Sequence, residues 1–242
     1  DALMPLIGIH WLKSIEGGDQ SLNLDFVRSS QLPGYTALNS SPSGLFGGNA
    51  DLGREFANTL TLSYQLNRGQ WHARAALFVR RDDDLVDWTY SQSAPFSRQA
   101  NPVDIDVSGL EMLARWTSDQ WQVIGAYTFI DKDADYGDVA VDASYYALNF
   151  ARHRATLSLL YQPVPSLDFR LDNEYRVQEE NPRRGSDDKA WQASFSIGWR
   201  LPTTSKLGLD LIVDNLTDSD FEEFPGTPAY GRQISLALGL AW

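Results

Sequence analysis

Four aspartates between residues 131 and 138 have the residue type and spacing to bind a metal ion, namely Asp131, Asp133, Asp135 and Asp138. Carboxylates on alternate residues beside the turn residue Gly137 resemble the oxygen ligands that one loop gives to Ca²⁺. However, this glycine lies one place later than in an EF-hand loop, and no closing glutamate follows. The segment is therefore interpreted either as a solvated acidic loop or as a calcium-binding outer loop, and no other cofactor is expected.

Bond-making chemistry finds little support in the sequence. His10, His72 and His153 lie on separate expected strands, without the spacing of a zinc protease or serine hydrolase motif. The run Asp82-Asp83-Asp84 is typical of a solvated strand end, and zero cysteines exclude a thiol nucleophile and a disulfide framework. The chain is therefore not expected to be an enzyme.

Small-molecule binding has better candidates, because aromatic rings and arginines are frequent in the long connecting segments. Rings with a polar tip offer broad contact areas, and guanidinium groups pair with carboxylates or phosphates. Each ring taken alone is better explained by loop packing, and only the concentration of the rings on one side of the membrane favours ligand binding for some of them. The candidate ligand-binding residues are Tyr35, Tyr90, Phe96, Arg98, Tyr145, Tyr146, Arg183, Phe224 and Tyr230.

Composition narrows the class of protein. The 242 residues carry a net charge of -12, which argues against a nucleic-acid partner, since phosphate binding requires clustered Lys and Arg. No run of about 18 apolar residues is present, which excludes a transmembrane helix. A transmembrane barrel stays compatible with the mean hydropathy of -0.34, because lipid-facing and lumen-facing residues alternate and average out.

Alternation with period two runs along most of the chain. In the last segment Ile234, Leu236 and Leu238 share one face, while Ser235 and Ala237 occupy the other. Such a strand fits an outer-membrane barrel or the half-buried sheet of a soluble sandwich. About eleven antiparallel strands are expected, at Leu3–Leu12, Ser21–Ser30, Glu55–Leu66, Trp71–Asp84, Asp106–Thr117, Trp121–Ile130, Arg152–Gln162, Ser166–Gln178, Trp191–Leu201, Lys206–Asp214 and Gln233–Trp242.

The connections between these strands alternate between short and long. Short turns alternating with long outer loops are the habit of outer-membrane barrels, whereas long loops are uncommon in compact soluble domains. The long connections are expected at Gln31–Arg54, Leu85–Ile105, Asp131–Ala151, Glu179–Ala190 and Asn215–Arg232.

Four short motifs, in order along the chain, carry a family resemblance. The segment Gly48–Glu55 precedes a strand that contains Asn58. It resembles the asparagine, aspartate-leucine and glutamate motif of TonB-dependent outer-membrane receptors, with Arg54-Glu55 where that family usually has Pro-Glu. The other three matches are Ala76–Arg80 followed by Asp84–Trp88, then Val213–Asp218, and then Tyr230-Gly231-Arg232 before the terminal strand.

The resemblance implies an all-β, antiparallel transmembrane β-barrel. Receptors of this family have 22 strands around a lumen closed by an N-terminal plug, on which the TonB protein pulls. Residues 1–242 are thus expected to be the C-terminal part of such a barrel, about half of it, with the plug domain and N-terminal strands absent. The start Asp1–Pro5 lacks a signal peptide, which fits that expectation.

The function implied is active import across the bacterial outer membrane. The expected partners are outer-membrane lipid, the N-terminal barrel half and plug, TonB acting through the plug, and a small-molecule nutrient such as an iron-siderophore or a cobalamin-like ligand. Two alternatives stay open: a complete smaller barrel, either a porin or a barrel hydrolase, and a soluble β-sandwich that binds glycans. A second layer of the same chain, sealed against the apolar stripes, would favour the sandwich.

Overall fold

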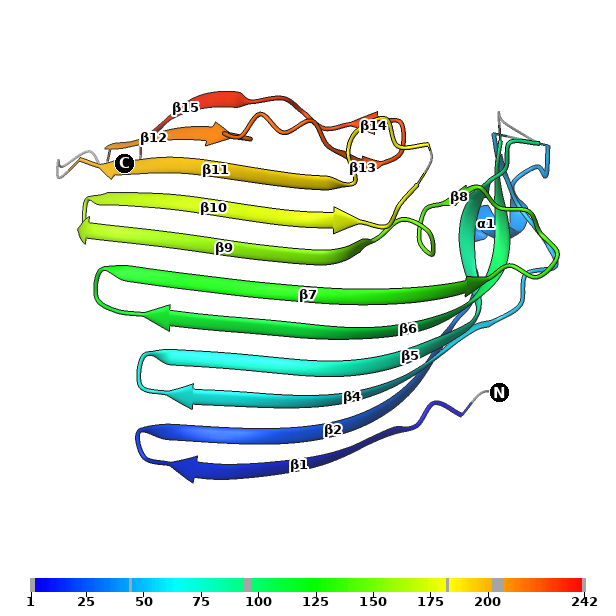
Figure 1. The fold of residues 1–242 in the computed structure, drawn as a ribbon, viewed down its shortest axis with the longest axis horizontal. Coiled ribbons are helices and arrows are strands. Elements are labelled where there is room, and N and C mark those ends of the chain that lie inside the picture. Colours follow the sequence, from blue (N-terminus) through cyan, green and yellow to red (C-terminus); the bar gives the residue numbers. More distant parts are fainter. Residues whose placement is uncertain (1–2, 44, 94–96, 182, 202–206, 241–242) are drawn as a thin grey trace.

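The long strands form one curved antiparallel sheet in which neighbours in sequence are neighbours in space (Figure 1). The computed structural model describes residues 3–43, 45–93, 97–181, 183–201 and 207–240. No helix among these residues is long and apolar enough to cross a membrane. In sheet order, the long strands are β1 Leu6–Ile15, β2 Gly18–Gln31, β4 Glu55–Arg68, β5 Trp71–Tyr90, β6 Arg98–Thr117, β7 Trp121–Asp135, β9 Ala151–Val164, β10 Leu167–Gln178, β11 Lys189–Arg200, β12 Leu207–Asp214 and β15 Gln233–Leu240.

Short elements decorate one end of this sheet. Helix α1 (Tyr35–Asn39) and strand β3 (Phe46–Gly47) lie in the connection after β2, and β3 pairs in parallel with β6. Strand β8 (Ala143–Ser144) pairs with β5, while β13 (Glu222–Phe224) and β14 (Thr227–Pro228) form a separate small hairpin. Figure 1 shows the short turns at one end of the sheet and the longer, decorated connections at the other.

The expected strands are confirmed, each overlapping one long strand of the sheet. Alternating apolar residues fix both strand and register, because a slip by one residue would move every side chain to the wrong face. Lys206, Ala241 and Trp242, at the ends of the last two expected strands, lie outside the described residues.

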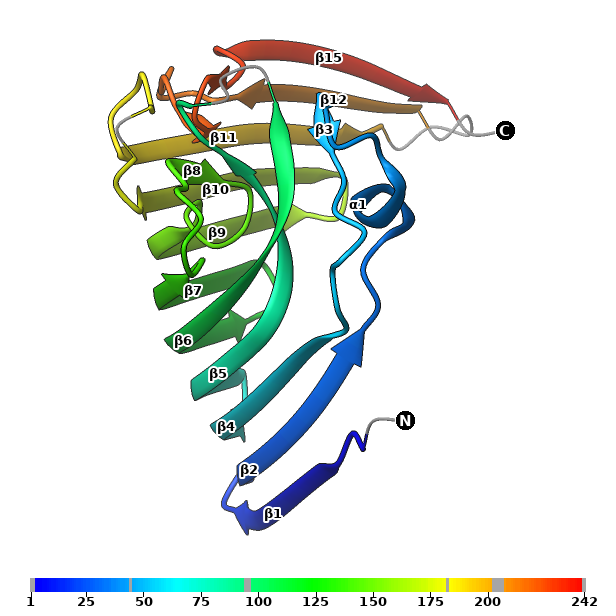
Figure 2. The same cartoon turned by 90° about the vertical axis from the view of Figure 1, so that its right-hand side faces the viewer.

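Two of the expected long loops are wrong in extent. Strands β5 and β6 continue through most of the segment expected as the loop Leu85–Ile105, and β7 continues to Asp135. The alternation stops at the acidic run, where β5 bulges between Asp82 and Leu85 and Asp84 has a φ of 57°. Pairing with β6 resumes beyond the bulge, so β5 and β6 extend past neighbouring strands toward α1 and β3 (Figure 2).

One face of the sheet is apolar and exposed. The register places Leu24, Leu62, Leu77, Leu110 and Phe129 in one row across five adjacent strands. Leu62 is 42% exposed and Leu77 is 56% exposed. Within the described residues no second layer of the chain covers this apolar face, whereas a soluble sandwich would pack a second sheet against it.

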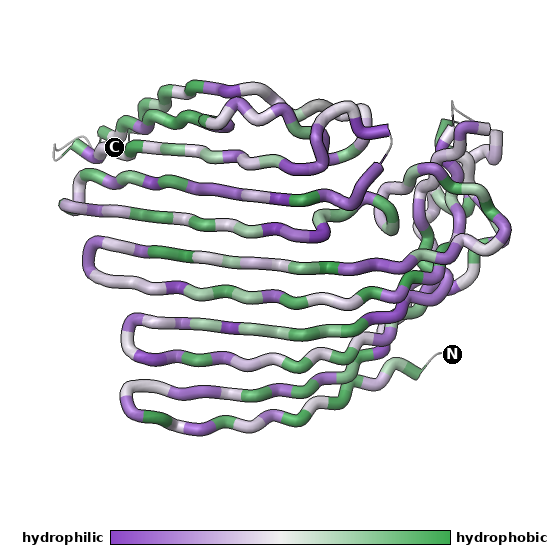
Figure 3. Tube along the Cα trace, viewed as in Figure 1, coloured by the Kyte–Doolittle hydropathy of each residue, from purple (hydrophilic) through white to green (hydrophobic). Residues whose placement is uncertain are grey.

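The opposite face is polar over much of its area. Along β10 it carries Arg170, Asp172, Glu174 and Arg176, and Asp172 lies between Ser158 of β9 and Ser194 of β11. Figure 3 shows the resulting alternation of hydrophilic and hydrophobic residues along the strands. The arrangement is a barrel wall that has not closed, since β1 and β15 each have one neighbour in the described sheet.

Candidate functional site

The candidate site lies where the long connections meet, at the end of the sheet that carries α1, β3 and β8 (Figure 1). The ends of β5 and β6 form its centre. Strand β3 adds to β6 on one side and β8 adds to β5 on the other. Pairing on both sides widens this extension of the main sheet, which can hold side chains more rigidly than a loop could.

Tyr90, the last residue of β5, gathers two of the predicted arginines. The guanidinium carbon of Arg98 lies 4.6 Å from the centre of the Tyr90 ring, and that of Arg183 lies 4.0 Å from it. Both distances are within the range of cation–π attraction. Three residues that the sequence marked as ligand-binding candidates are therefore brought together, although they come from segments far apart in sequence.

A buried carboxylate holds the segment 136–147 against β5. Asp87 is 1% exposed and accepts hydrogen bonds from the backbone N–H of Tyr146 at 3.0 Å and of Ala147 at 2.8 Å. The hydroxyl of Tyr136 donates a third, at 3.0 Å. Burial, and next the neighbouring Asp87 carboxylate, raise the pKa of Tyr136 far above its usual range, so its hydroxyl stays a donor.

The same segment closes a small apolar core on the polar face of β5, β6 and β7. Val103, Ile105 and Val107 are buried there together with Ala147. Lys132 crosses the rim of this core, with Nζ 3.0 Å from the carbonyl oxygen of Tyr146 and 4.0 Å from its ring centre. Tyr146, predicted to bind ligand, thus serves to fasten the segment.

A second aromatic group lies toward the C-terminal strands. The rings of Tyr145 and Phe224, both predicted candidates, are stacked with centres 4.3 Å apart and planes 12° apart. Near them Arg176 lies over the ring of Phe221, at 4.7 Å. A hollow of about 440 Å³ is lined partly by Arg176, Phe221 and Tyr230. Its mixture of rings and polar groups suits a small ligand.

Glu222 links the β13–β14 hairpin to the connection that carries Arg183. Its carboxylate accepts hydrogen bonds from the backbone N–H of Gly226 at 2.8 Å and of Gly185 at 3.0 Å. These bonds, the one from Gly226 first, lower the pKa of Glu222 below its ordinary value of 4.5. The carboxylate thus fixes the position of the connection between β10 and β11.

We expect this link to loosen in acid. Because the folded pKa of Glu222 is lowered, its contribution is present above pH 4.5 and is lost as the pH falls through the lowered pKa. Hydrogen-exchange protection of the Gly185 and Gly226 amides should therefore fall in that window, and Glu222→Gln should remove the pH dependence. Identical pH profiles for the two proteins would contradict this assignment.

The acidic run Asp82-Asp83-Asp84 is not simply solvated, so that interpretation is wrong for its first member. Asp82 is 1% exposed and forms an ion pair with Arg80 at 2.6 Å. Asp83 pairs with Arg81 at 2.9 Å, and the N–H of Asp84 donates to the Asp104 carboxylate at 2.9 Å. A buried carboxylate needs such a partner, because an unpaired one would be costly.

The structure does not gather the four aspartates into a calcium-binding loop. Asp131, Asp133 and Asp135 belong to the extended part of β7, where alternate side chains project side by side instead of converging. Asp131 pairs with Arg152 at 3.3 Å, and Asp135 accepts the Gly137 N–H at 2.8 Å. Among the described residues no group of three or more His, Asp or Glu is placed to hold a metal ion, Asp138 included.

The remaining candidates make no contact with the Tyr90 ring in the structure as described. Tyr35 opens α1 and is 81% exposed, and Tyr230 is 84% exposed at the edge of the 440 Å³ hollow. Phe96 lies outside the described residues. The histidines stay apart: His72 and His153 bond to Asn67 and Tyr127 at 2.6 and 2.8 Å, and His10 bonds to Asn23. The sequence analysis assigned no role to Asp87 or Lys132. The sequence marks each of them only as a charged residue in an extended segment.

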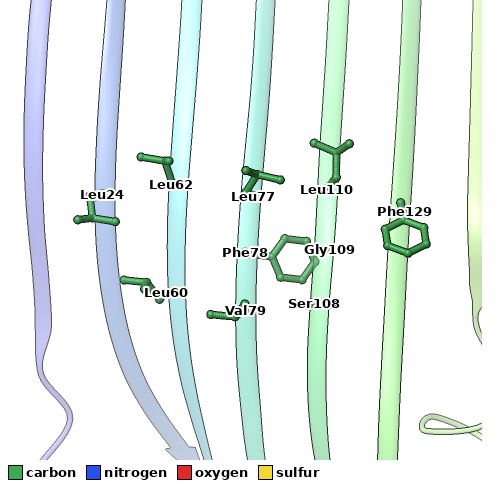
Figure 4. Close-up of a pocket in the computed structure, with 10 residues that line it drawn as sticks. All are labelled: Leu24, Leu60, Leu62, Leu77, Phe78, Val79, Ser108, Gly109, Leu110 and Phe129. Atoms are coloured by element: carbon green, nitrogen blue, oxygen red, sulfur yellow. The ribbon is translucent and has the colours of Figure 1, made fainter.

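An apolar hollow lies on the apolar face of the sheet and not at this site. It has a volume of about 520 Å³ and lies over the row from Leu24 to Phe129, beside Ser108 and Gly109 (Figure 4). Figure 4 shows aliphatic side chains and the rings of Phe78 and Phe129 on neighbouring strands around it, without a charged group among them. Such a furrow lacks the polar groups that would orient a nutrient.

Comparison with known proteins places this chain in a protein family. The family model described as "TonB dependent receptor-like, beta-barrel" matches residues 17–216. No curated protein matches the chain. Among solved structures, the copper transporter OprC is 18% identical with a TM-score of 0.71, over 96% of this chain and 37% of its own.

Two further solved structures agree in fold. The ferric-catecholate import receptor Fiu from Escherichia coli K12 is 22% identical, with a TM-score of 0.66, over 96% of this chain and 34% of its own. The pyoverdine outer membrane receptor FpvA from Pseudomonas aeruginosa PAO1 is 12% identical, with a TM-score of 0.67, over 99% of this chain and 36% of its own. The chain thus spans only about a third of the structures it matches. With the match over residues 17–216, the chain belongs to the TonB-dependent receptor β-barrel family, whose members are transport receptors and not enzymes.

Proposed function

We propose that this chain forms part of the barrel of an outer-membrane receptor that binds a ferric siderophore and imports it with energy from TonB. The observation that carries the proposal is the family match over residues 17–216. Its support from geometry is the gathering of Tyr90, Arg98 and Arg183, and of Tyr145 with Phe224, at one end of the sheet. In this proposal the ligand binds at the end of the sheet where the long connections meet.

Each face of the sheet has its own task in this proposal. The apolar face, with Leu62 and Leu77 exposed, contacts the acyl chains of the outer membrane. The polar face lines the lumen and meets the plug domain. Its charges are paired along the wall, with Arg154 and Glu174 2.6 Å apart and Arg200 and Asp210 2.7 Å apart. Because these charges are paired within the wall, movement of the plug does not leave an unpaired charge.

The ligand class rests on the names of the structural neighbours together with the loop chemistry. Fiu is named for ferric catecholate and FpvA for pyoverdine, whereas OprC is named for copper. None of these three names supports the cobalamin alternative. Rings and arginines at the site fit an aromatic, oxygen-rich chelate better than a bare metal ion, since no set of metal-binding side chains is gathered in the described part of the chain.

Uptake of iron tests this proposal directly. Cells that express the full-length receptor as their only siderophore receptor should accumulate radioactive iron from a ferric siderophore, and uptake should fall to background when TonB is deleted. Equal uptake with and without TonB, or steady ion conductance of the purified receptor in planar bilayers, would contradict active import and favour a porin.

A further inference from the structure

Two arginines share one aromatic ring and have no acidic partner. Within the described residues, neither Arg98 nor Arg183 has a carboxylate within ion-pair distance, whereas Arg80, Arg152 and Arg184 each have one. The Nε atoms of Arg98 and Arg183 are buried without a hydrogen-bond partner among the residues that the structure describes. In the same part of the chain, the Arg98 side chain makes a long hydrogen bond from Nη1 to the Ser97 carbonyl oxygen at 3.4 Å.

This arrangement is costly unless an anion completes it. Two like charges close to one ring repel each other, and half-buried guanidinium groups without acceptors lose hydration. Attraction to the Tyr90 ring offsets only part of that cost. An incoming anion would supply the missing acceptors and neutralise the repulsion.

Three separate connections hold the two side chains in place before any ligand arrives. The N–H of Arg98 donates to the Leu45 carbonyl oxygen at 2.7 Å, which ties the start of β6 to the segment before β3. The N–H of Arg183 donates to Asn181 Oδ1 at 3.0 Å. Tyr90 itself is 8% exposed and paired with Ala143. The carboxylate of Asp142, the residue before β8, already accepts the Gln92 N–H at 2.6 Å.

We propose that Arg98 and Arg183, held on Tyr90, form an anion-binding site that makes the receptor select negatively charged chelates over neutral ones. The inference rests on the proposed function and narrows its ligand to oxygen-rich anions, such as catecholate or carboxylate chelates of ferric iron. Guanidinium groups present planar forks that match such oxygens in pairs. In a chain of net charge -12, this local positive site is what overcomes general repulsion of anions.

Binding of chelates of different charge tests the site. The purified full-length receptor in detergent would be titrated with a negatively charged ferric tris-catecholate, with ferric citrate and with an electrically neutral ferric tris-hydroxamate. We expect an anionic chelate to bind more tightly than the neutral one. Arg183→Gln and Arg98→Gln should each weaken it about tenfold to a hundredfold, the effect of losing charge-assisted hydrogen bonds.

Control variants separate the site from general charge and from folding. Arg54→Gln removes the same charge from an exposed arginine bonded to Ser30 Oγ at 3.2 Å, away from Tyr90, and should leave binding unchanged. Arg183→Lys keeps the charge but loses the fork, and should recover part of the affinity. A shift in gel mobility between the unheated and the heated receptor confirms that each variant has folded.

The possible results divide cleanly. Equal affinity for neutral and anionic chelates, failure of either anionic chelate to bind, or unchanged anion binding in the Arg98→Gln/Arg183→Gln double variant would overturn the anion site. If TonB-dependent uptake of the neutral chelate persists in that case, the proposed import function stands without the anion site. Absence of TonB-dependent uptake for every chelate would overturn the import function as well.

Discussion

Replacement of Asp87 by alanine is expected to release the segment 136–147 from the barrel wall. The change leaves the N–H groups of Tyr146 and Ala147 and the hydroxyl of Tyr136 without their shared acceptor. Hydrogen bonds to a charged group contribute about 1.5–3 kcal/mol each, so a loss of about 3 kcal/mol or more of local stability follows. Hydrogen-exchange protection of the Tyr146 and Ala147 amides should fall about a hundredfold or more.

Matched substitutions in the same region show whether this effect is specific. Asp142→Ala removes an exposed carboxylate that accepts a single bond from the Gln92 N–H, and it should leave the Ala147 amide protected. Asp87→Asn keeps one acceptor oxygen, so protection of the Ala147 amide should be intermediate between that in Asp87→Ala and that in Asp142→Ala. If the Ala147 amide exchanges at the same rate in the Asp87→Ala receptor as in the unchanged receptor, the Asp87 carboxylate does not hold the segment 136–147 against β5.

The second large effect is expected from a charge placed on the apolar face. Leu62→Arg puts a guanidinium in the middle of the row that Leu24, Leu77, Leu110 and Phe129 share. An arginine facing lipid at mid-membrane costs about 2–4 kcal/mol. The unfolding free energy of the receptor refolded in lipid vesicles, measured by denaturant titration, should fall by that amount.

The adjacent residue supplies the matched control. Thr61 lies next in β4 and faces the opposite side, across from Asp25 of β2. Thr61→Arg should cost much less, because water and a carboxylate are within reach of the new side chain. Equal losses of unfolding free energy for the two variants would contradict the assignment of one face to lipid and the other to water.

Period-two alternation made the sheet predictable from sequence, and its interruption marks the limit of that prediction. Across β4 the pattern fixed strand, face and register together, because lipid-like and water-like surroundings reward opposite residue types. At Asp82 the pattern broke, yet β5 continued to Tyr90. What sustains the strand there is pairing with β6 and β8, a long-range property that no local pattern encodes.

The candidate site was predictable in residue type but not in arrangement. Tyr90, Arg98 and Arg183 were recognisable as rings and cations in connecting segments, and the structure brings them together. Tyr146 had the same signature and proved to fasten a loop. The aspartates from 131 to 135 were expected in one loop, but β7 extends through them, so the structure spaces them along a strand. Side chains from different connections come into contact only because the strand register of the whole sheet sets the positions of those connections.

The two-sided environment of the sheet is the central claim, and its most direct test uses single cysteines. These 242 residues contain no cysteine, and in a full-length receptor freed of any other cysteine, spin labels placed one at a time at positions 59–64 of β4 report each site alone. Labels at 60, 62 and 64 should be accessible to oxygen dissolved in lipid, and those at 59, 61 and 63 should not. Equal oxygen accessibility at all six positions, or the opposite alternation, would contradict the account.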